Sequence, residues 1–168
     1  IDKNHLEASV DRINKHYGNK DCKAYHDYRE MMARDDIDTV MLAVPDNWHA
    51  LMSIEAAKNR KDIYGEKPLA RTIREQQLIV KAVQKNRRIW QTGSWQRSQT
   101  PFRNAVEIVR NGLIGRLTRV EVGLPPGHTD FAGTGKKLSI TAPPPELDYD
   151  RWIGPSRMEP YIEGRVHM

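Results

Sequence analysis

Hydrophobic positions in the first two thirds of the chain follow two different periods. Apolar residues recur every three to four positions over residues 3–17, which predicts an amphipathic helix, and Gly18 is expected to end it in the left-handed conformation. Asp27 is placed to cap a short second helix. Residues 38–44, by contrast, form a largely apolar run that ends at Pro45, which is typical of a strand buried on both faces of a parallel sheet.

The alternation of helix and strand continues beyond this strand. The elements that we predict there are a helix capped by Asp46 or Asn47 and ending near Lys58, a strand over residues 62–64, a helix over 73–85, a strand over 88–92 and a helix over 101–110. Strands that alternate with helices of about ten to fifteen residues are joined by right-handed crossovers and form a parallel sheet. The fold class is therefore α/β.

Two helix-to-strand connections have similar sequences. Residues 58–61 and 85–88 each combine Lys, Asn and Arg at the end of a predicted helix. We expect Asn59 and Asn86 to adopt the left-handed conformation that often follows a helix, because asparagine tolerates it. The cationic side chains favour the negative end of the helix dipole, so these two basic clusters need no ligand to explain them.

The pattern changes after Gly115. Residues 116–122 alternate between apolar and polar positions, which predicts a half-exposed strand. Residues 124–145 are rich in Gly and Pro, which predicts a long irregular loop. We therefore expect two domains, with residues 1–115 in a parallel α/β domain and residues 116–168 at the beginning of a second one.

Composition narrows the class of protein. Of the 168 residues, 38% are hydrophobic and 29% are charged, as in ordinary globular proteins. The longest apolar run, residues 40–44, is too short to cross a membrane. The net charge of +5 is spread over short clusters, which does not favour a nucleic-acid partner. The 6 histidines lack metal-ligand spacing, and the single Cys22 cannot form an internal disulfide.

Polar and aromatic residues follow three of the predicted strands. In an open parallel sheet, ligands bind beyond the carboxyl ends of the strands. The three segments in such positions are Pro45-Asp-Asn-Trp-His49, Gly65-Glu-Lys-Pro68 and Gly93-Ser-Trp-Gln-Arg97. Because parallel strands end at the same edge of the sheet, the sequence predicts one binding site made of these segments.

Lys67 is the first candidate for chemistry within this predicted site. It follows a buried strand and stands between Glu66 and Pro68. A lysine held beside a reacting group can donate or accept a proton. The alternative is an exposed lysine in an ordinary strand-to-helix turn.

The other candidates also have structural alternatives. His49 either hydrogen-bonds a ligand or holds its own loop at the start of a helix, and Trp48 either stacks on a ligand or packs in the core. Trp95 offers an aromatic face and Arg97 a planar guanidinium, both suited to sugars and acids. An ordinary salt bridge explains Arg97 equally well.

The order of these motifs along the chain is typical of one family. Its segments here are Pro45–His49, Glu66-Lys-Pro68 seventeen residues beyond His49, Gln91-Thr-Gly-Ser-Trp-Gln-Arg97, and residues 109–115, 123–126 and 148–155. Together they resemble the Gfo/Idh/MocA oxidoreductases, in particular the bacterial branch that carries Gly-Ser-x-Gln-Arg after Glu-Lys-Pro. The resemblance covers nearly the whole chain.

The resemblance implies an N-terminal Rossmann domain and a C-terminal α/β domain with a mostly antiparallel sheet. It further implies NAD or NADP as the cofactor, a sugar, inositol or related polyol as the substrate, and hydride transfer between them. The resemblance assigns Lys67 as the catalytic residue and places Trp95 and Arg97 at the substrate. It places eight residues at the cofactor: Pro45, Asn47, Trp48, His49, Glu66, Lys67, Pro68 and Gln91. A homo-oligomer is expected, and relatives are either cytoplasmic or exported by a twin-arginine route.

The sequence departs from the family pattern at both ends. The strand and Gly-x-Gly-x-x-Gly turn that cradle the cofactor pyrophosphate would precede Ile1, and the family's later Asp-x-x-x-His motif would follow Met168. We therefore expect residues 1–115 to form part of a Rossmann domain and this chain alone to be inactive and to bind cofactor weakly. The alternative is a naturally short, non-catalytic relative that dimerises or binds through its exposed sheet edge.

Overall fold

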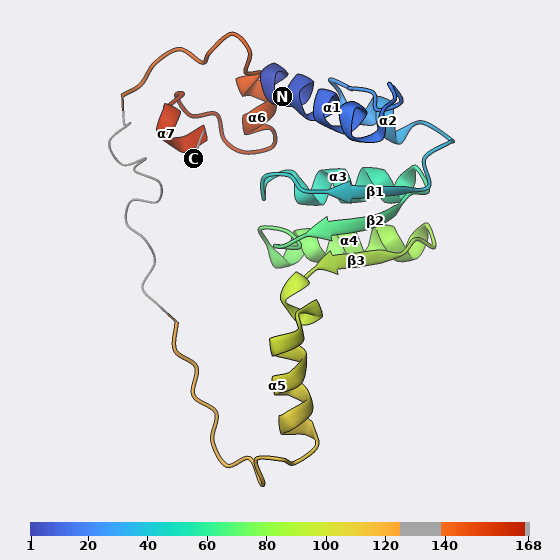
Figure 1. Ribbon diagram of the computed structural model, residues 1–168. Coiled ribbons are helices and arrows are strands. Elements are labelled where there is room, and N and C mark those ends of the chain that lie inside the picture. Colours follow the sequence, from blue (N-terminus) through green and yellow to red (C-terminus); the bar gives the residue numbers. More distant parts are fainter. Residues whose placement is uncertain (125–138, 167–168) are drawn as a thin grey trace.

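A three-stranded parallel sheet lies at the centre of the computed structural model, which describes residues 1–124 and 139–166. The strands β1 (Thr39–Leu42), β2 (Asp62–Glu66) and β3 (Trp90–Gly93) are hydrogen-bonded in the order β1-β2-β3. Helices α3 (His49–Lys58) and α4 (Ile73–Lys85) connect them and lie together on one face of the sheet (Figure 1). The predicted α/β class is confirmed.

Local sequence signals explain where most helices begin and end. Helix α1 (Lys3–Tyr17) ends at Gly18, which has a φ of 66°, as predicted. Helix α2 (Tyr28–Met32) begins after Asp27, whose carboxylate accepts from the backbone N–H of Arg29 at 2.9 Å, also as predicted. Helix α4 has a complete capping box, because Thr72 and Glu75 each accept a backbone N–H of the other.

The predicted cap of α3 is wrong. The helix begins at His49, and neither Asp46 nor Asn47 caps it: Trp48 occupies the N-cap position and makes no side-chain cap hydrogen bond. The Asn47 amide instead donates to the carbonyl of Ile153, 106 residues further along the chain, at 2.7 Å. A long-range partner has therefore replaced the local one that the sequence suggested.

The two similar connections are shifted by one residue from the prediction. Asn59 and Asn86 have φ angles of −84° and −93°, and the left-handed residues are Arg60 and Arg87 at 61° and 54°. The reason lies in the amide side chains. Each asparagine donates its Nδ2 to the carbonyl four residues earlier, at 2.9 Å and 2.8 Å, and so stays near the helical conformation.

Two of the three apolar clusters in the described residues hold the larger parts of the molecule together, and the third, with Ala50, Ala70 and Ile79 buried, joins α3 to α4. The larger one fills the space between the sheet and the helices around α3, with Met32, Val40, Leu42, Trp48, Met52, Ala56, Ala57 and Ile63 buried. The smaller one joins the C-terminal helices α6 (Tyr149–Ile153) and α7 (Glu163–Val166), with Leu147, Tyr149, Ile153 and Tyr161 buried and Ile1 packed against them. The two chain ends of the described part are thereby brought together.

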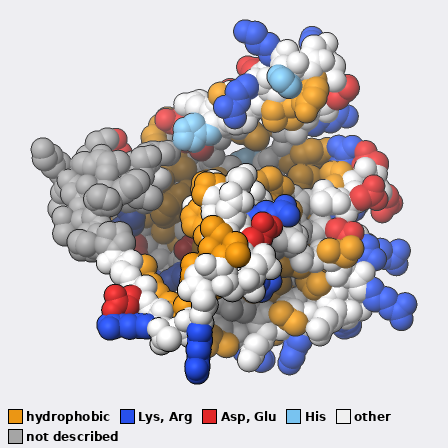
Figure 2. All heavy atoms as spheres, turned by 60° about the horizontal axis from the view of Figure 1, so that its bottom comes forward, with side chains coloured by type: hydrophobic (Ala, Val, Ile, Leu, Met, Phe, Trp, Pro, Cys, Tyr) orange, Lys and Arg blue, Asp and Glu red, His pale blue; other side chains and the backbone are white. Residues whose placement is uncertain are grey.

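Helix α5 (Thr100–Arg110) extends away from the sheet, after the short 3-10 helix η1 (Trp95–Ser98) (Figure 1). Its apolar side chains are exposed, with Phe102 at 50% and Val106 at 51%. Figure 2 views the molecule from this end and shows exposed hydrophobic side chains with Lys and Arg side chains scattered around them. No helix among residues 1–124 and 139–166 is long and apolar enough to span a membrane.

The predicted strand over residues 116–122 is absent. These residues are exposed and form neither helix nor strand, with Val120 at 71% and Val122 at 80%. An alternating sequence becomes a strand only beside a hydrogen-bonding partner, and the described part of the chain places none there. The predicted loop of residues 124–145 lies mostly outside the described residues, which resume at 139.

Candidate functional site

Parallel pairing brings the three predicted segments to one edge of the sheet. Leu42 lies opposite Gly65, and Glu66 lies opposite Gly93, so the three strands end almost level with one another. Residues 43–48 follow β1, residues 67–72 follow β2, and η1 follows β3. The sequence therefore located the edge correctly, although no ligand contact tests the roles of its residues.

Glycines allow the close approach of strands and side chains at this edge. A Cβ built on Gly93 would lie 2.8 Å from the carboxylate of Glu66, so that carboxylate covers the end of β3. The indole ring of Trp90 fills the space where Gly65 would carry a side chain. Both glycines are needed because of these neighbours, since a methyl group would force either side chain to move.

Lys67 directly follows the covered strand end. Its side chain is exposed, and its peptide bond to Pro68 is cis. Among the described residues the Lys67 amine makes no hydrogen bond or ion pair, whereas Glu66 beside it is half-buried. The structure thus leaves the amine open to a ligand at the edge, and its catalytic role stays a prediction.

His49 holds the loop after β1 from the inside. The side chain is 1% exposed, and Nε2 lies 2.9 Å from the carbonyl oxygen of Val44. Because a carbonyl only accepts, Nε2 carries the proton and donates it. The other ring nitrogen, Nδ1, is buried without a hydrogen-bond partner among the described residues. The histidine therefore makes the loop-holding contact that was one of its two predicted roles.

Asn47 and Trp48 turn their polar atoms toward α6. The indole nitrogen of Trp48 donates to the carbonyl of Arg151 at 2.9 Å, and the Asn47 amide donates to the carbonyl of Ile153. Trp48 is 8% exposed, and its ring meets the ring of Tyr28 edge-on at 5.8 Å. Of the two predicted roles for Trp48, packing is the one that these contacts show.

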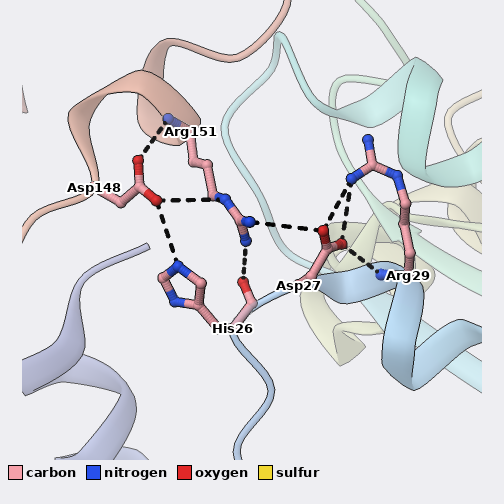
Figure 3. Close-up of polar contacts among 5 residues, drawn as sticks. All are labelled: His26, Asp27, Arg29, Asp148 and Arg151. Atoms are coloured by element: carbon pink, nitrogen blue, oxygen red, sulfur yellow. Dashed lines mark hydrogen bonds and ion pairs between the residues drawn. The ribbon is translucent and has the colours of Figure 1, made fainter.

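A chain of polar contacts continues from α6 to the start of α2 (Figure 3). Asp148 lies 3.4 Å from His26 and 3.3 Å from the guanidinium of Arg151, which lies 3.7 Å from Asp27. The pKa of Asp27 is lowered, chiefly because it accepts the backbone N–H of Arg29. Sequence analysis found the cap at Asp27 but missed this network, since no local signal joins residues more than a hundred positions apart.

The remaining candidates lie along and beyond β3. Gln91 is exposed and donates to the carbonyl of Thr92 at 3.0 Å. Trp95 is 54% exposed. Arg97 lines a hollow of about 510 Å³ together with side chains of α5. Trp95 and Arg97 thus lie in η1 just beyond β3, and their contact with a substrate stays a prediction.

In residues 1–124 and 139–166, no group of three or more His, Cys, Asp or Glu side chains is placed to hold a metal ion. The carboxyl edge of the sheet instead combines an exposed amine, a half-buried carboxylate and aromatic rings. Such a set suits an organic ligand with hydroxyl groups.

Comparison with known protein families shows which family this chain belongs to. Residues 4–94 match the oxidoreductase family with the NAD-binding Rossmann fold known as Gfo/Idh/MocA, and residues 98–168 match the C-terminal α/β domain of oxidoreductases of this family. The chain belongs to the Gfo/Idh/MocA family. The predicted family, its Rossmann fold and its class of cofactor are thereby confirmed.

The curated relatives of this chain include a protein named as an oxidoreductase and one named as a glycosidase. An uncharacterized oxidoreductase of Bacillus subtilis, YrbE, is 32% identical over 142 residues, which cover 82% of this chain and 42% of that protein. An α-N-acetylgalactosaminidase of Shewanella oneidensis is 36% identical over 97 residues, which cover 56% of this chain and 20% of that enzyme. The chain thus spans less than half the length of either relative.

Solved structures of the same fold include inositol dehydrogenases. The myo-inositol 2-dehydrogenase of Lactobacillus plantarum is 28% identical and superposes with a TM-score of 0.60 over 68% of this chain and 32% of its own. The scyllo-inositol dehydrogenase of Lactobacillus casei with bound NAD(H) and scyllo-inositol is 25% identical, with a TM-score of 0.57 over 64% of this chain and 32% of its own. The Gfo/Idh/MocA chain described here therefore shares its fold with inositol dehydrogenases, one of which was solved with bound NAD(H).

Proposed function

We propose that the protein containing this chain is an NAD(P)-dependent oxidoreductase of a sugar, an inositol or a related polyol. The observation that carries the proposal is the exposed, unpaired Lys67 at the carboxyl edge of a parallel sheet, among described residues. This is the edge at which open α/β sheets bind their ligands. Inositol dehydrogenases among the solved structures support the class of substrate.

The residues at the edge fit the nicotinamide end of the cofactor. The exposed Pro45 after β1, the half-buried Glu66 at the end of β2 and the exposed Gln91 within β3 belong to three neighbouring strands or the loop that follows them, and would border a flat ring. The Glu66 carboxylate fills the space that Gly93 leaves beside it, so this side of the proposed nicotinamide site is already formed. A bound nicotinamide cofactor accepts or returns the hydride of the substrate carbon.

Lys67 would handle the proton that accompanies the hydride. When an alcohol is oxidised, its carbon loses a hydride and its hydroxyl loses a proton, and an amine within hydrogen-bond distance of the hydroxyl can accept that proton. Trp95 and Arg97, both exposed beyond β3, would meet the sugar ring and its hydroxyl groups. The roles of all three residues rest on the same edge geometry.

A second candidate function is the cleavage of a glycosidic bond with the same cofactor. The curated relatives include glycosyl hydrolase family 109 proteins and an α-N-acetylgalactosaminidase, at 34–36% identity over 97–99 residues. Glycosidases that depend on NAD exist alongside those that use two carboxylates. Such an enzyme would release a sugar without net reduction of the cofactor.

The decisive experiment uses the full-length gene product with NAD or NADP and a panel of inositols, sugars and N-acetylgalactosaminides. Formation of the reduced cofactor, measured at its absorbance band, would support the dehydrogenase. Release of the aglycone without reduced cofactor would support the glycosidase instead. Absence of both reactions across the panel would overturn the two proposals and favour a non-catalytic relative.

Substitution of Lys67 tests its role directly. We expect Lys67→Met to lower kcat by about 10²- to 10⁴-fold, because proton transfer by a positioned side chain contributes about this much. Lys58→Met is the matched control, since Lys58 is also exposed but ends α3 at the opposite edge of the sheet. Turnover of Lys67→Met within threefold of the control would exclude the catalytic role.

A further inference from the structure

The last turn of α6 lies against the loop that follows β1. A helix leaves its last four carbonyl groups without partners inside the helix. Two of those in α6 accept from this loop: the carbonyl of Arg151 accepts from the indole of Trp48, and that of Ile153 accepts from the amide of Asn47. The loop therefore supplies two hydrogen bonds to the end of a helix that lies about a hundred residues further along the chain.

Close packing accompanies these hydrogen bonds. Gly154 ends α6 with a φ of 54°, and a side chain at this position would run into the indole ring of Trp48. The same ring belongs to the buried cluster that joins β1 to α3. Trp48 thus contacts the core of the sheet on one side and the end of α6 on the other, so neither can shift without disturbing it.

The side chain of Arg151 adds further contacts between α6 and the start of α2. The guanidinium donates to the carbonyl of His26 at 2.8 Å and lies near Asp27 and Asp148 (Figure 3). Asp148 also caps α6 by accepting the backbone N–H of Arg151 at 3.0 Å. The exposed ion pairs contribute little individually, but the hydrogen bonds add to those of Asn47 and Trp48.

The tip of the loop remains open while its base is held. Pro45 and Asp46 are exposed, whereas Asn47 is half-buried and Trp48 and His49 are buried. His49 holds the base from within through the carbonyl of Val44. Contacts from inside the sheet and from α6 therefore fix the conformation in which the tip faces the carboxyl edge.

We propose that Asn47 and Trp48 are positioning residues: α6 sets, through them, the conformation of the loop that borders the cofactor. The inference rests on the proposed function, because it assigns the loop tip to the nicotinamide cofactor. It predicts that loosening α6 weakens cofactor binding without slowing the reaction of bound substrate. The C-terminal part of the chain thereby controls affinity at a site built on the N-terminal sheet.

The test replaces one hydrogen bond at a time in the full-length gene product. Trp48→Phe removes the indole N–H and keeps a ring over Gly154, and Asn47→Ala removes the second donor without touching the core. Asn59→Ala is the matched control, because the Asn59 amide also donates to a backbone carbonyl, that of Glu55 at 2.9 Å, but lies at the end of α3, at the opposite edge of the sheet. Hydrogen–deuterium exchange of residues 45–49 and 148–154 is measured with the Kd for NAD and NADP, the KM and kcat.

Trp48→Phe and Asn47→Ala are each expected to speed exchange in both segments and to raise the cofactor Kd and KM about two- to tenfold, the effect of one hydrogen bond. The value of kcat should stay within twofold, and Asn59→Ala should change neither exchange in these segments nor Kd. Faster exchange confined to residues 148–154, with Kd unchanged, would overturn the inference. An equal rise of Kd in Asn59→Ala would do the same.

Failure of the proposed function gives a different result. A wild-type protein that binds neither NAD nor NADP would overturn the oxidoreductase assignment. In that case, hydrogen–deuterium exchange of residues 45–49 and 148–154 would decide by itself whether α6 positions the loop. Coupled exchange of the two segments in Trp48→Phe would uphold that positioning, and independent exchange would overturn it.

Discussion

Helices α4 and α5 are of the same kind but lie in opposite environments. Both are amphipathic, about equally long and followed by an asparagine at the C-cap. The apolar face of α4 packs on α3 and the sheet, where Ile79 is 1% exposed, whereas α5 leaves Val106 51% exposed. Local sequence therefore decides that a helix forms, and the presence of a partner decides whether its apolar face contributes to stability.

The largest expected difference in stability between the two helices comes from removing a buried side chain of α4. Ile79→Ala is expected to lower the free energy of unfolding by about 2–5 kcal/mol, because it removes buried methyl groups and leaves a cavity in the packed face of α4. Val106→Ala should change it by less than about 0.5 kcal/mol, since the side chain is exposed and alanine favours helix. Urea unfolding followed by circular dichroism measures both.

Similar losses of unfolding free energy in Ile79→Ala and Val106→Ala would contradict the contrast between α4 and α5. They would mean that the apolar face of α5 is covered in solution by another part of the protein or by a second copy. Dependence of the Val106→Ala effect on protein concentration would then identify a second copy, because association stabilises the folded state by mass action.

The next largest expected effect on stability comes from the N-terminal caps of the two helices. Thr72→Ala removes half of the capping box of α4 and should destabilise the protein by about 1 kcal/mol. Gln99 stands at the same position before α5 but makes no cap hydrogen bond with its side chain. Gln99→Ala should therefore leave the urea midpoint within experimental error. A measurable loss there would show that α5 depends on its first turn more than the structure indicates.

Local signals account for the parts of the fold that sequence analysis predicted correctly. The bounds of the helix over Ile73–Lys85 follow from Thr72 and Lys85, and the end of the first helix follows from Gly18. The carboxyl edge was predictable because parallel strands leave few alternatives for where polar loops can meet. Periodicity and caps act within a few residues, and these features depend on nothing further away.

Features that depend on distant partners were not predictable. Asn47 looked like a helix cap but donates to Ile153, and Trp48 packs in the core, one of its two predicted roles, but its indole also donates to Arg151, which no local signal indicated. The alternating residues 116–122 looked like a strand but have no neighbour to pair with among the described residues. Each of these outcomes depends on what lies beside a segment in space, and one sequence carries no local signal of that.

Helix α6 differs from both α4 and α5, because polar contacts as well as apolar ones hold it in place, and this should make its anchoring depend on pH. Asp27 joins α2 to Arg151 of α6, and its pKa is lowered, first by the backbone N–H of Arg29 and also by the guanidinium groups of Arg29 and Arg151. A carboxylate with a lowered pKa stabilises the folded state above the pKa of the unfolded chain. That stability is lost as pH falls through the folded pKa.

Asp27→Asn keeps an N-cap acceptor but removes the charge, so it isolates this electrostatic part. We expect a loss of about 0.5 kcal/mol at pH 7, the size typical of exposed pairs and helix-end charges. The difference from the wild type should shrink as pH is lowered below about 4, the usual pKa of an aspartate, and vanish below the folded pKa, where both proteins are neutral at this position. Urea midpoints between pH 7 and 3 measure it, with Asp11→Asn on α1 as the control. A difference that stays constant down to pH 3 would show that Asp27 acts as a cap alone, and that α6 is held by its hydrogen bonds and apolar contacts.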